Sequence, residues 1–132
     1  IDLVVVEGTE IRAPLPGTIH SAADNSGLGN YGPTVILRHE LEGIEFHTLY
    51  GHLGRRSIER FEPGDRLAAG DPVGEVGDLQ ENGSWPPHLH FQIIADSVDG
   101  VVDYPGVAAP SDVDRYLDLC PDPNLILGIS GL

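Results

Sequence analysis

Short runs of alternating apolar and polar residues, separated by Gly and Pro, fill most of the first 95 positions of the chain. A period of two residues is typical of strands that bury one face. Seventeen Gly and eleven Pro indicate many turns and little long helix. A short echo between 8–13 and 64–69 suggests a turn-and-strand unit that occurs twice. The pattern predicts a mostly antiparallel β-domain, with strands at 1–6, 11–13, 18–23, 34–38, 44–50, 66–68, 73–76 and 88–93.

The pattern changes after Ala95. An acidic loop over 96–110 precedes a capping signature at Ser111, and Pro121 marks the end of the helix that this signature begins. The final stretch 124–129 is expected to form an apolar strand or tail. One short C-terminal helix is therefore predicted, with one apolar stripe formed by Val113, Tyr116, Leu117 and Cys120.

The length of 132 residues suits one domain with a core of its own. We expect a core over 1–95 and a C-terminal region over 96–132 that packs on this core or leads to a following domain. Because the chain lacks Met and opens directly on a strand, it is expected to be a piece of a longer protein, whose other domains are expected partners. No apolar run approaches the length of a membrane span.

The formal net charge of −14 changes the set of expected partners. Such a charge repels nucleic acids and anionic membranes, so neither is expected to bind. The chain has no Lys, which excludes Schiff-base chemistry and the biotinyl or lipoyl attachment of carboxyl-carrier domains. The single Cys120 allows no internal disulfide and is expected to be a packing residue rather than a nucleophile.

The stretch from Trp85 to Gln92 carries the first candidate chemistry. On a strand, His88 and His90 point to the same face, while Leu89 and the apolar residues that alternate with it point into a core. Two imidazoles on one face can share a metal ion or a substrate. The alternative is a pair of histidines on the wet face of a sheet.

The other four histidines differ in their surroundings. His20 and His39 lie among polar neighbours and are expected at the surface, whereas His47 alternates with apolar positions and is expected to be packed or half-buried. His52 follows a strand end beside a Gly, where its ring could lean over the sheet. The polar loop 24–32 fits either the wall of a cleft or a simple connector.

A hydrolytic zinc site needs about three ligands from His, Asp or Glu and one open position for water. A nearby imidazole can act as a base in its neutral form, or stabilise an oxyanion in its protonated form. Asp2 is an isolated carboxylate in an apolar run, which is costly unless it finds solvent, a partner or a metal. Asp2, His90, His88 and His52 are the right residue types for these roles.

Several motifs together resemble the lysostaphin-type (LytM-like) zinc metallopeptidases over about residues 1–95. The matching stretches are Ile1-Asp2-Leu3, Ala13-Pro14-x-x-Gly17, Tyr50-Gly51-His52-Leu53, Gly64-Asp65-x-x-x-x-Gly70-Asp71-x-x-Gly74 and Pro87-His88-Leu89-His90-Phe91. The resemblance implies an all-β fold, a mostly antiparallel β-sandwich of the duplicated hybrid motif type, with the short C-terminal helix added.

The resemblance also implies roles for four residues and a substrate. Asp2 and His90 would bind Zn²⁺, His88 would be the catalytic histidine near the bound water, and His52 would stabilise the tetrahedral intermediate. Enzymes of this family cut peptide cross-links in bacterial peptidoglycan. The family's first zinc ligand is a His four residues ahead of the Asp, outside these 132 residues, so weak or absent metal binding is expected at this chain length.

Two further features bear on localisation. The net charge of −14 suits an anionic cell wall poorly. Residues 120–128 resemble the tails of peptidase-like modules that stand beside aminotransferase-type domains in longer proteins. The family implies a cell-envelope or secreted protein, whereas the fusion would imply a cytoplasmic one.

Two other functions compete with the peptidase hypothesis. One is a degenerate peptidase-like module that binds or regulates within a multidomain protein. The other is a phosphocarrier of the sugar phosphotransferase type, in which His52 would face His88 or His90 without a metal. Asp2 has no role in the phosphocarrier, and the negative charge disfavours docking of a phosphoryl donor.

Overall fold

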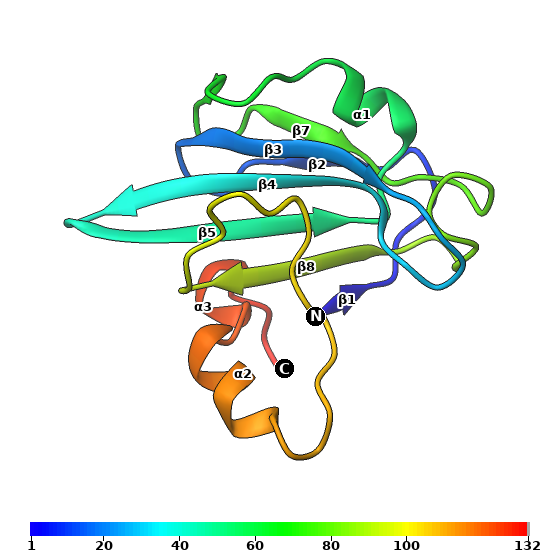
Figure 1. Ribbon diagram of the computed structural model, residues 1–132. Helices are drawn as coiled ribbons and strands as arrows, with labels where there is room; N and C mark the ends of the chain where they lie inside the picture. The colour runs from blue at the N-terminus through cyan, green and yellow to red at the C-terminus, as the bar shows by residue number, and fades with distance from the viewer. Residues whose placement is uncertain (132) are drawn as a thin grey trace.

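The computed structural model describes residues 1–131, and its main element is a six-stranded sheet in the order β1-β8-β5-β4-β3-β6 (Figure 1). A two-stranded sheet pairs β2 with β7, and all of these strand pairs are antiparallel. The strands are β1 Asp2–Leu3, β2 Glu10–Arg12, β3 Gly17–Asn25, β4 Gly32–Leu41, β5 Ile44–Gly51, β6 Arg66–Leu67, β7 Pro72–Glu75 and β8 Leu89–Ile94.

Three short helices lie on two opposite sides of the six-stranded sheet. α1 (Arg55–Glu59) covers the side of β3 and β7, while α2 (Val113–Leu119) and α3 (Asn124–Leu127) lie beyond β8 (Figure 1). The predicted fold class, mostly antiparallel β with a short C-terminal helix, is confirmed, and α2 is that helix. None of the helices among residues 1–131 is long and apolar enough to span a bilayer.

Both faces of the six-stranded sheet are covered by apolar side chains. One face packs against β2, β7 and the segments around them, and its centre includes Leu37, Tyr50 and Phe91. The other face packs against the segment that follows β8. Figure 1 shows this segment crossing in front of the sheet. The second cluster consists of Ile36, Leu49, Ile94, Val98 and Tyr104, with Tyr31, Tyr116 and Cys120 at its margin.

The expected strand over 1–6 is wrong beyond its first residues, because β1 ends at Leu3. Leu3 pairs with Leu89, the first residue of β8. Pro86 and Pro87 precede β8, and proline cannot donate a ladder hydrogen bond. The chain after Leu3 therefore has no strand to pair with, and Val4 is 88% exposed.

The hairpin between β4 and β5 is tighter than the sequence pattern predicts. Only Glu42 and Gly43 form the turn, with φ angles of 53° and 81°, so the strands extend to Leu41 and Ile44. A two-residue turn with both φ angles positive matches the twist of its strands. His39 consequently lies within β4 and not in a loop.

The prediction that His39 is a surface residue is wrong, since it is only 2% exposed. Its Nδ1 lies 2.8 Å from the carbonyl oxygen of Pro16, and its Nε2 lies 2.7 Å from Thr48 Oγ1. Burial lowers its pKa, against the opposing effect of the Pro16 carbonyl. His47 is buried as predicted, and His20 is half-buried.

The C-terminal predictions hold in part. Asp112, not Ser111, occupies the N-cap position of α2, and only part of the apolar stripe is covered, because Leu117 is 66% exposed. The expected strand or tail at 124–129 is wrong, because Asn124 starts α3. The Asn124 side chain hydrogen-bonds both the N–H and the carbonyl oxygen of Ile129, which closes this turn locally.

Acid should destabilise the fold through its buried histidines. Burial lowers the pKa of His39, His47 and His52 in the folded chain. In the unfolded chain these histidines bind protons near their ordinary pKa of about 6.5, which is a higher pH than in the folded chain. The stability that these groups contribute is present above about pH 6.5, and it is lost as the pH falls toward their pKa values in the folded chain. The unfolding free energy, measured by denaturant titration, should therefore drop between about pH 7.5 and about pH 5.

A pair of variants isolates the contribution of His39. His39→Gln should reduce the drop, because one titrating group is removed. Val35→Ala, which creates a cavity in the core without touching a histidine, should lower stability equally at both pH values. An unchanged pH dependence in His39→Gln would contradict the assignment.

Candidate active site

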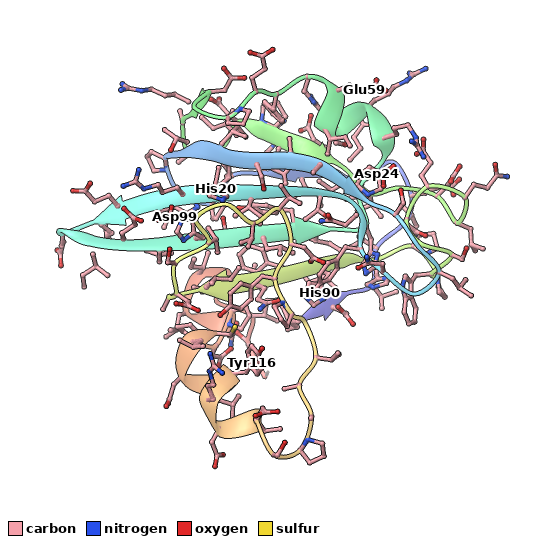
Figure 2. The ribbon with its side chains drawn as sticks, viewed as in Figure 1. His20, Asp24, Glu59, His90, Asp99 and Tyr116 are labelled. Carbon is pink, nitrogen blue, oxygen red and sulfur yellow. The ribbon has the colours of Figure 1, made fainter. Side chains whose placement is uncertain are left out.

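Three segments of the sheet bring the sequence-predicted residues together. His90 lies on β8 between two partners, paired with Asp2 of β1 on one side and with Gly51 of β5 on the other. His88 immediately precedes β8, and His52 immediately follows β5. Figure 2 shows His90 near the end of β8 that faces β1. All four predicted residues lie in one site.

Asp2 and His90 form the closest pair of the site. His90 Nδ1 lies 2.7 Å from Asp2 Oδ1, and His88 Nε2 lies 3.9 Å from the same oxygen. Burial on its own raises the pKa of Asp2, but the hydrogen bond with His90 and the nearby histidines outweigh it and lower the pKa overall. Asp2 is therefore a carboxylate at neutral pH.

Asp2 and His90 are of residue types that bind metal ions, but the two together supply only part of a metal site. A carboxylate oxygen and an imidazole nitrogen at hydrogen-bond distance are both zinc-ligand types, and a structural or catalytic zinc needs at least three protein ligands. Within residues 1–131, no group of three or more His, Cys, Asp or Glu side chains is arranged to hold a metal ion.

His52 and His88 stand side by side with their ring centroids 4.3 Å apart. His52 Nδ1 lies 2.8 Å from the carbonyl oxygen of Asn82, and His88 Nδ1 lies 2.6 Å from that of Pro86. Because a carbonyl oxygen can only accept, both Nδ1 atoms carry the hydrogen in the neutral rings. Each Nε2 then has a lone pair available in the cleft.

Burial lowers the pKa of His52 to about 4, although the Asn82 carbonyl and the Asp2 charge oppose the shift. The ring is therefore neutral at physiological pH. Perturbed titration in a cleft is typical of functional sites. His52 can accept a proton at Nε2.

The backbone of His52 is strained, with a φ of 62° that non-glycine residues rarely adopt. Its N–H donates to the carbonyl of Tyr31 at 2.8 Å, and its carbonyl accepts from the N–H of Gly77 at 2.9 Å. Such strain persists where the surroundings hold it, and it is common at functional sites.

These side chains line a cleft of about 670 Å³. One wall comes from the loop 29–31, another from Trp85-Pro86-Pro87, and a third from the segment 103–107 after β8. Among the described residues that line it, Asp2 and Asp103 are acidic and none is Arg. The lining consists of Asp2, Val4, Gly29, Asn30, Tyr31, His52, Trp85, Pro86, Pro87, His88, His90, Asp103, Tyr104, Pro105, Gly106 and Val107.

Tyr31 lines the cleft, although the sequence pattern predicts no role for it beyond that of its loop as a possible cleft wall. Its ring centroid lies 4.8 Å from that of His90 and 5.8 Å from that of His52. Its hydroxyl donates to the carbonyl of Tyr104 at 3.1 Å. Burial raises the pKa of Tyr31, so it stays a phenol.

Two more residues were missed, and no local sequence signal could have found them. Asn82 is fully buried, holds His52 through its carbonyl, and bonds the backbone of Trp85 through its side chain. Gln92 is buried on β8, and its Oε1 lies 3.1 Å from His90 Nε2. Both act through contacts between distant segments.

The fold and the cleft define a class: antiparallel β-sheet proteins with an aspartate and three histidines in one groove. Residues 1–101 match the model of the family described as Peptidase family M23. The chain belongs to peptidase family M23.

Solved structures agree with this assignment. A variant catalytic domain of the prophage-encoded M23 protein EnpA from Enterococcus faecalis is 28% identical, with a TM-score of 0.59 over 76% of this chain and 70% of that one. LytU is 29% identical, with a TM-score of 0.55 over 92% and 73%. The catalytic domain of the antimicrobial peptidase lysostaphin from Staphylococcus simulans, 24% identical, shares the fold with a TM-score of 0.59 over 97% and 77%.

A curated relative from Haemophilus influenzae is described as an uncharacterized metalloprotease. It is 32% identical over 96 residues, which make up 70% of this chain. The chain spans only 17% of that protein's length.

The segment 103–107 should tolerate no side chain at Gly106. A Cβ there would lie 2.0 Å from the Tyr31 hydroxyl oxygen and 3.1 Å from His90 Cε1. Gly106→Ala should therefore lower the unfolding free energy by about 1–3 kcal/mol and speed hydrogen exchange in this segment. Gly54→Ala is the matched control, because its Cβ would come closest to the movable carboxylate of Glu81, at 3.3 Å, and would meet backbone atoms only at ordinary contact distances of 3.8 and 3.9 Å. Equal effects of the two substitutions would contradict the packing described.

Proposed function

We propose that this chain is the catalytic domain of a zinc-dependent metalloendopeptidase. The observation that carries the proposal is the convergence of a paired aspartate and histidine and two further imidazoles on one cleft. Membership of peptidase family M23 supports it. The residues concerned are Asp2, His90, His88 and His52.

Asp2 and His90 would hold the zinc ion together with a third ligand, which the family resemblance places four residues ahead of Asp2. Zinc supplies Lewis-acid chemistry, lowering the pKa of a bound water toward neutrality and polarising the scissile carbonyl. The carboxylate state of Asp2 favours this role, since a protonated carboxyl is a poor ligand.

His88 and His52 would handle protons and charge at the peptide bond. His88 Nε2 lies 3.9 Å from the Asp2 oxygen, which supports a role in accepting a proton from water next to the ligands. His52 has a lone pair at Nε2 in its neutral form, so it would stabilise the negative charge that develops on the carbonyl oxygen of the substrate only after Nε2 has taken up a proton. Because both Nδ1 atoms are held by backbone carbonyls, neither ring can rotate without losing a hydrogen bond.

The substrate that we propose is a peptide, in particular the peptide cross-links of bacterial cell walls. The cleft offers apolar and backbone surfaces from Trp85, the two prolines after it and Val107, which suit an extended chain with small side chains. A cell-envelope or secreted location follows from this substrate. Family membership favours the peptidase over the phosphocarrier hypothesis.

Zinc content separates an active from a degenerate site. Elemental analysis should find about one zinc per chain in a version that carries about twenty further natural residues ahead of Ile1, and little in residues 1–132. Zinc binding without hydrolysis of a cross-linked peptide would favour the binding or regulatory module. Absence of zinc from both versions would refute the metallopeptidase.

Two substitutions in the longer version separate ligand from catalyst. His90→Ala should abolish stoichiometric zinc, whereas His88→Ala should retain zinc and lose hydrolysis by about 10²–10⁴-fold, the usual contribution of a general base. His20→Ala, at a half-buried imidazole that does not line the cleft, is the control for both. Full zinc in His90→Ala would show that the ligand assignment is incorrect.

A further inference from the structure

Gln92 connects the proposed ligand His90 to the part of the chain beyond the family match. It lies two positions after His90 on β8, on the same face, and is 7% exposed. Its Nε2 donates to the carbonyl of Pro105 at 3.1 Å and contacts Cys120 Sγ at 3.1 Å. Its Oε1 lies 3.1 Å from His90 Nε2. Pro105 and Cys120 both follow residue 101, where the family match ends.

The orientation of the Gln92 amide follows from chemistry. The carbonyl oxygen of Pro105 can only accept a hydrogen bond, so the NH₂ group of Gln92 must face it. The amide oxygen then faces His90 and can likewise only accept. His90 Nε2 must therefore carry the hydrogen.

Tyr31 is compatible with the same arrangement. Its hydroxyl hydrogen is directed to the carbonyl oxygen of Tyr104, so the lone pairs of the hydroxyl oxygen are free. This oxygen lies 3.4 Å from His90 Nε2 and adds a second, longer acceptor for the same N–H. Two backbone carbonyls of the segment 103–107 thus orient both acceptors.

We propose that Gln92 is a positioning residue that keeps a hydrogen on His90 Nε2 and so leaves Nδ1 for the metal ion, and that Pro105 and Cys120 in the C-terminal region orient Gln92. This inference rests on the proposed function, in which His90 binds zinc. Nδ1 is then the nitrogen left for the metal ion, which would replace the hydrogen between Nδ1 and the Asp2 oxygen 2.7 Å away.

The contact between Gln92 and His90 Nε2 matters because Asp2 favours the tautomer that has its hydrogen on Nδ1. A carboxylate next to Nδ1 attracts a hydrogen onto that nitrogen, and a metal ion cannot bind a nitrogen that carries one. A buried acceptor at Nε2 counters this pull. Loss of a partner that orients a ligating histidine typically lowers metal affinity by 10–100-fold.

Nitrogen chemical shifts of the imidazole test the proposal without any metal. In long-range ¹H–¹⁵N spectra of the 132-residue chain, His90 Nε2 should have the shift of a protonated nitrogen. In Gln92→Met, which keeps the length of the side chain but removes its acceptor, Nε2 should have the shift of an unprotonated nitrogen. Gln92→Glu should restore the protonated shift because it restores an acceptor. Gln80→Met, at an exposed glutamine, is the control.

Two results would overturn the proposal: an unprotonated Nε2 in the unchanged chain, which needs no variant to fold, or a protonated Nε2 that persists in a folded Gln92→Met. Zinc affinity of the longer version gives a second readout, and its dissociation constant should rise about 10–100-fold in Gln92→Met. If the longer version binds no zinc at all, the proposed function fails, while the tautomer result still stands or falls independently.

Discussion

The register of β8 between β1 and β5 is the constraint on which the cleft depends. His90 faces Asp2 across one ladder and Gly51 across the other, so three distant parts of the chain meet at one residue. Because side chains alternate along a strand, a slip of one residue would turn His90 into the core and Leu89 into the cleft. The buried face of β8 fixes this register, since Leu89 and Phe91 occupy the core.

The second half of the site depends on a strained residue that its neighbours hold in place. A positive φ at a non-glycine residue costs about 1–3 kcal/mol, and His52 has one. Backbone hydrogen bonds to Tyr31 and Gly77 and the ring contact with the Asn82 carbonyl fix this conformation from two loops. Buried contacts hold these loops in turn, so the position of the His52 imidazole depends on the packing of both loops at this end of the sheet.

Local periodicity predicted which side chains share a face better than it predicted burial. The shared face of His88 and His90 follows from the two-residue period, and the structure confirms it. His39 was misplaced because its sequence neighbours are polar, whereas its burial depends on a tight turn and on Thr48 from the next strand. Gln92 could not be recognised because its partners are tens of residues away and are supplied by the fold.

Residues beyond the family match help to cover the second face of the six-stranded sheet. The family match ends at residue 101, but Ile36, Leu49 and Ile94 are covered by residues on both sides of that boundary, including Tyr104. Severing the chain at the end of the match would leave an apolar sheet face in water, which favours self-association. The segment that matches the family is therefore smaller than the segment that covers both faces of the six-stranded sheet.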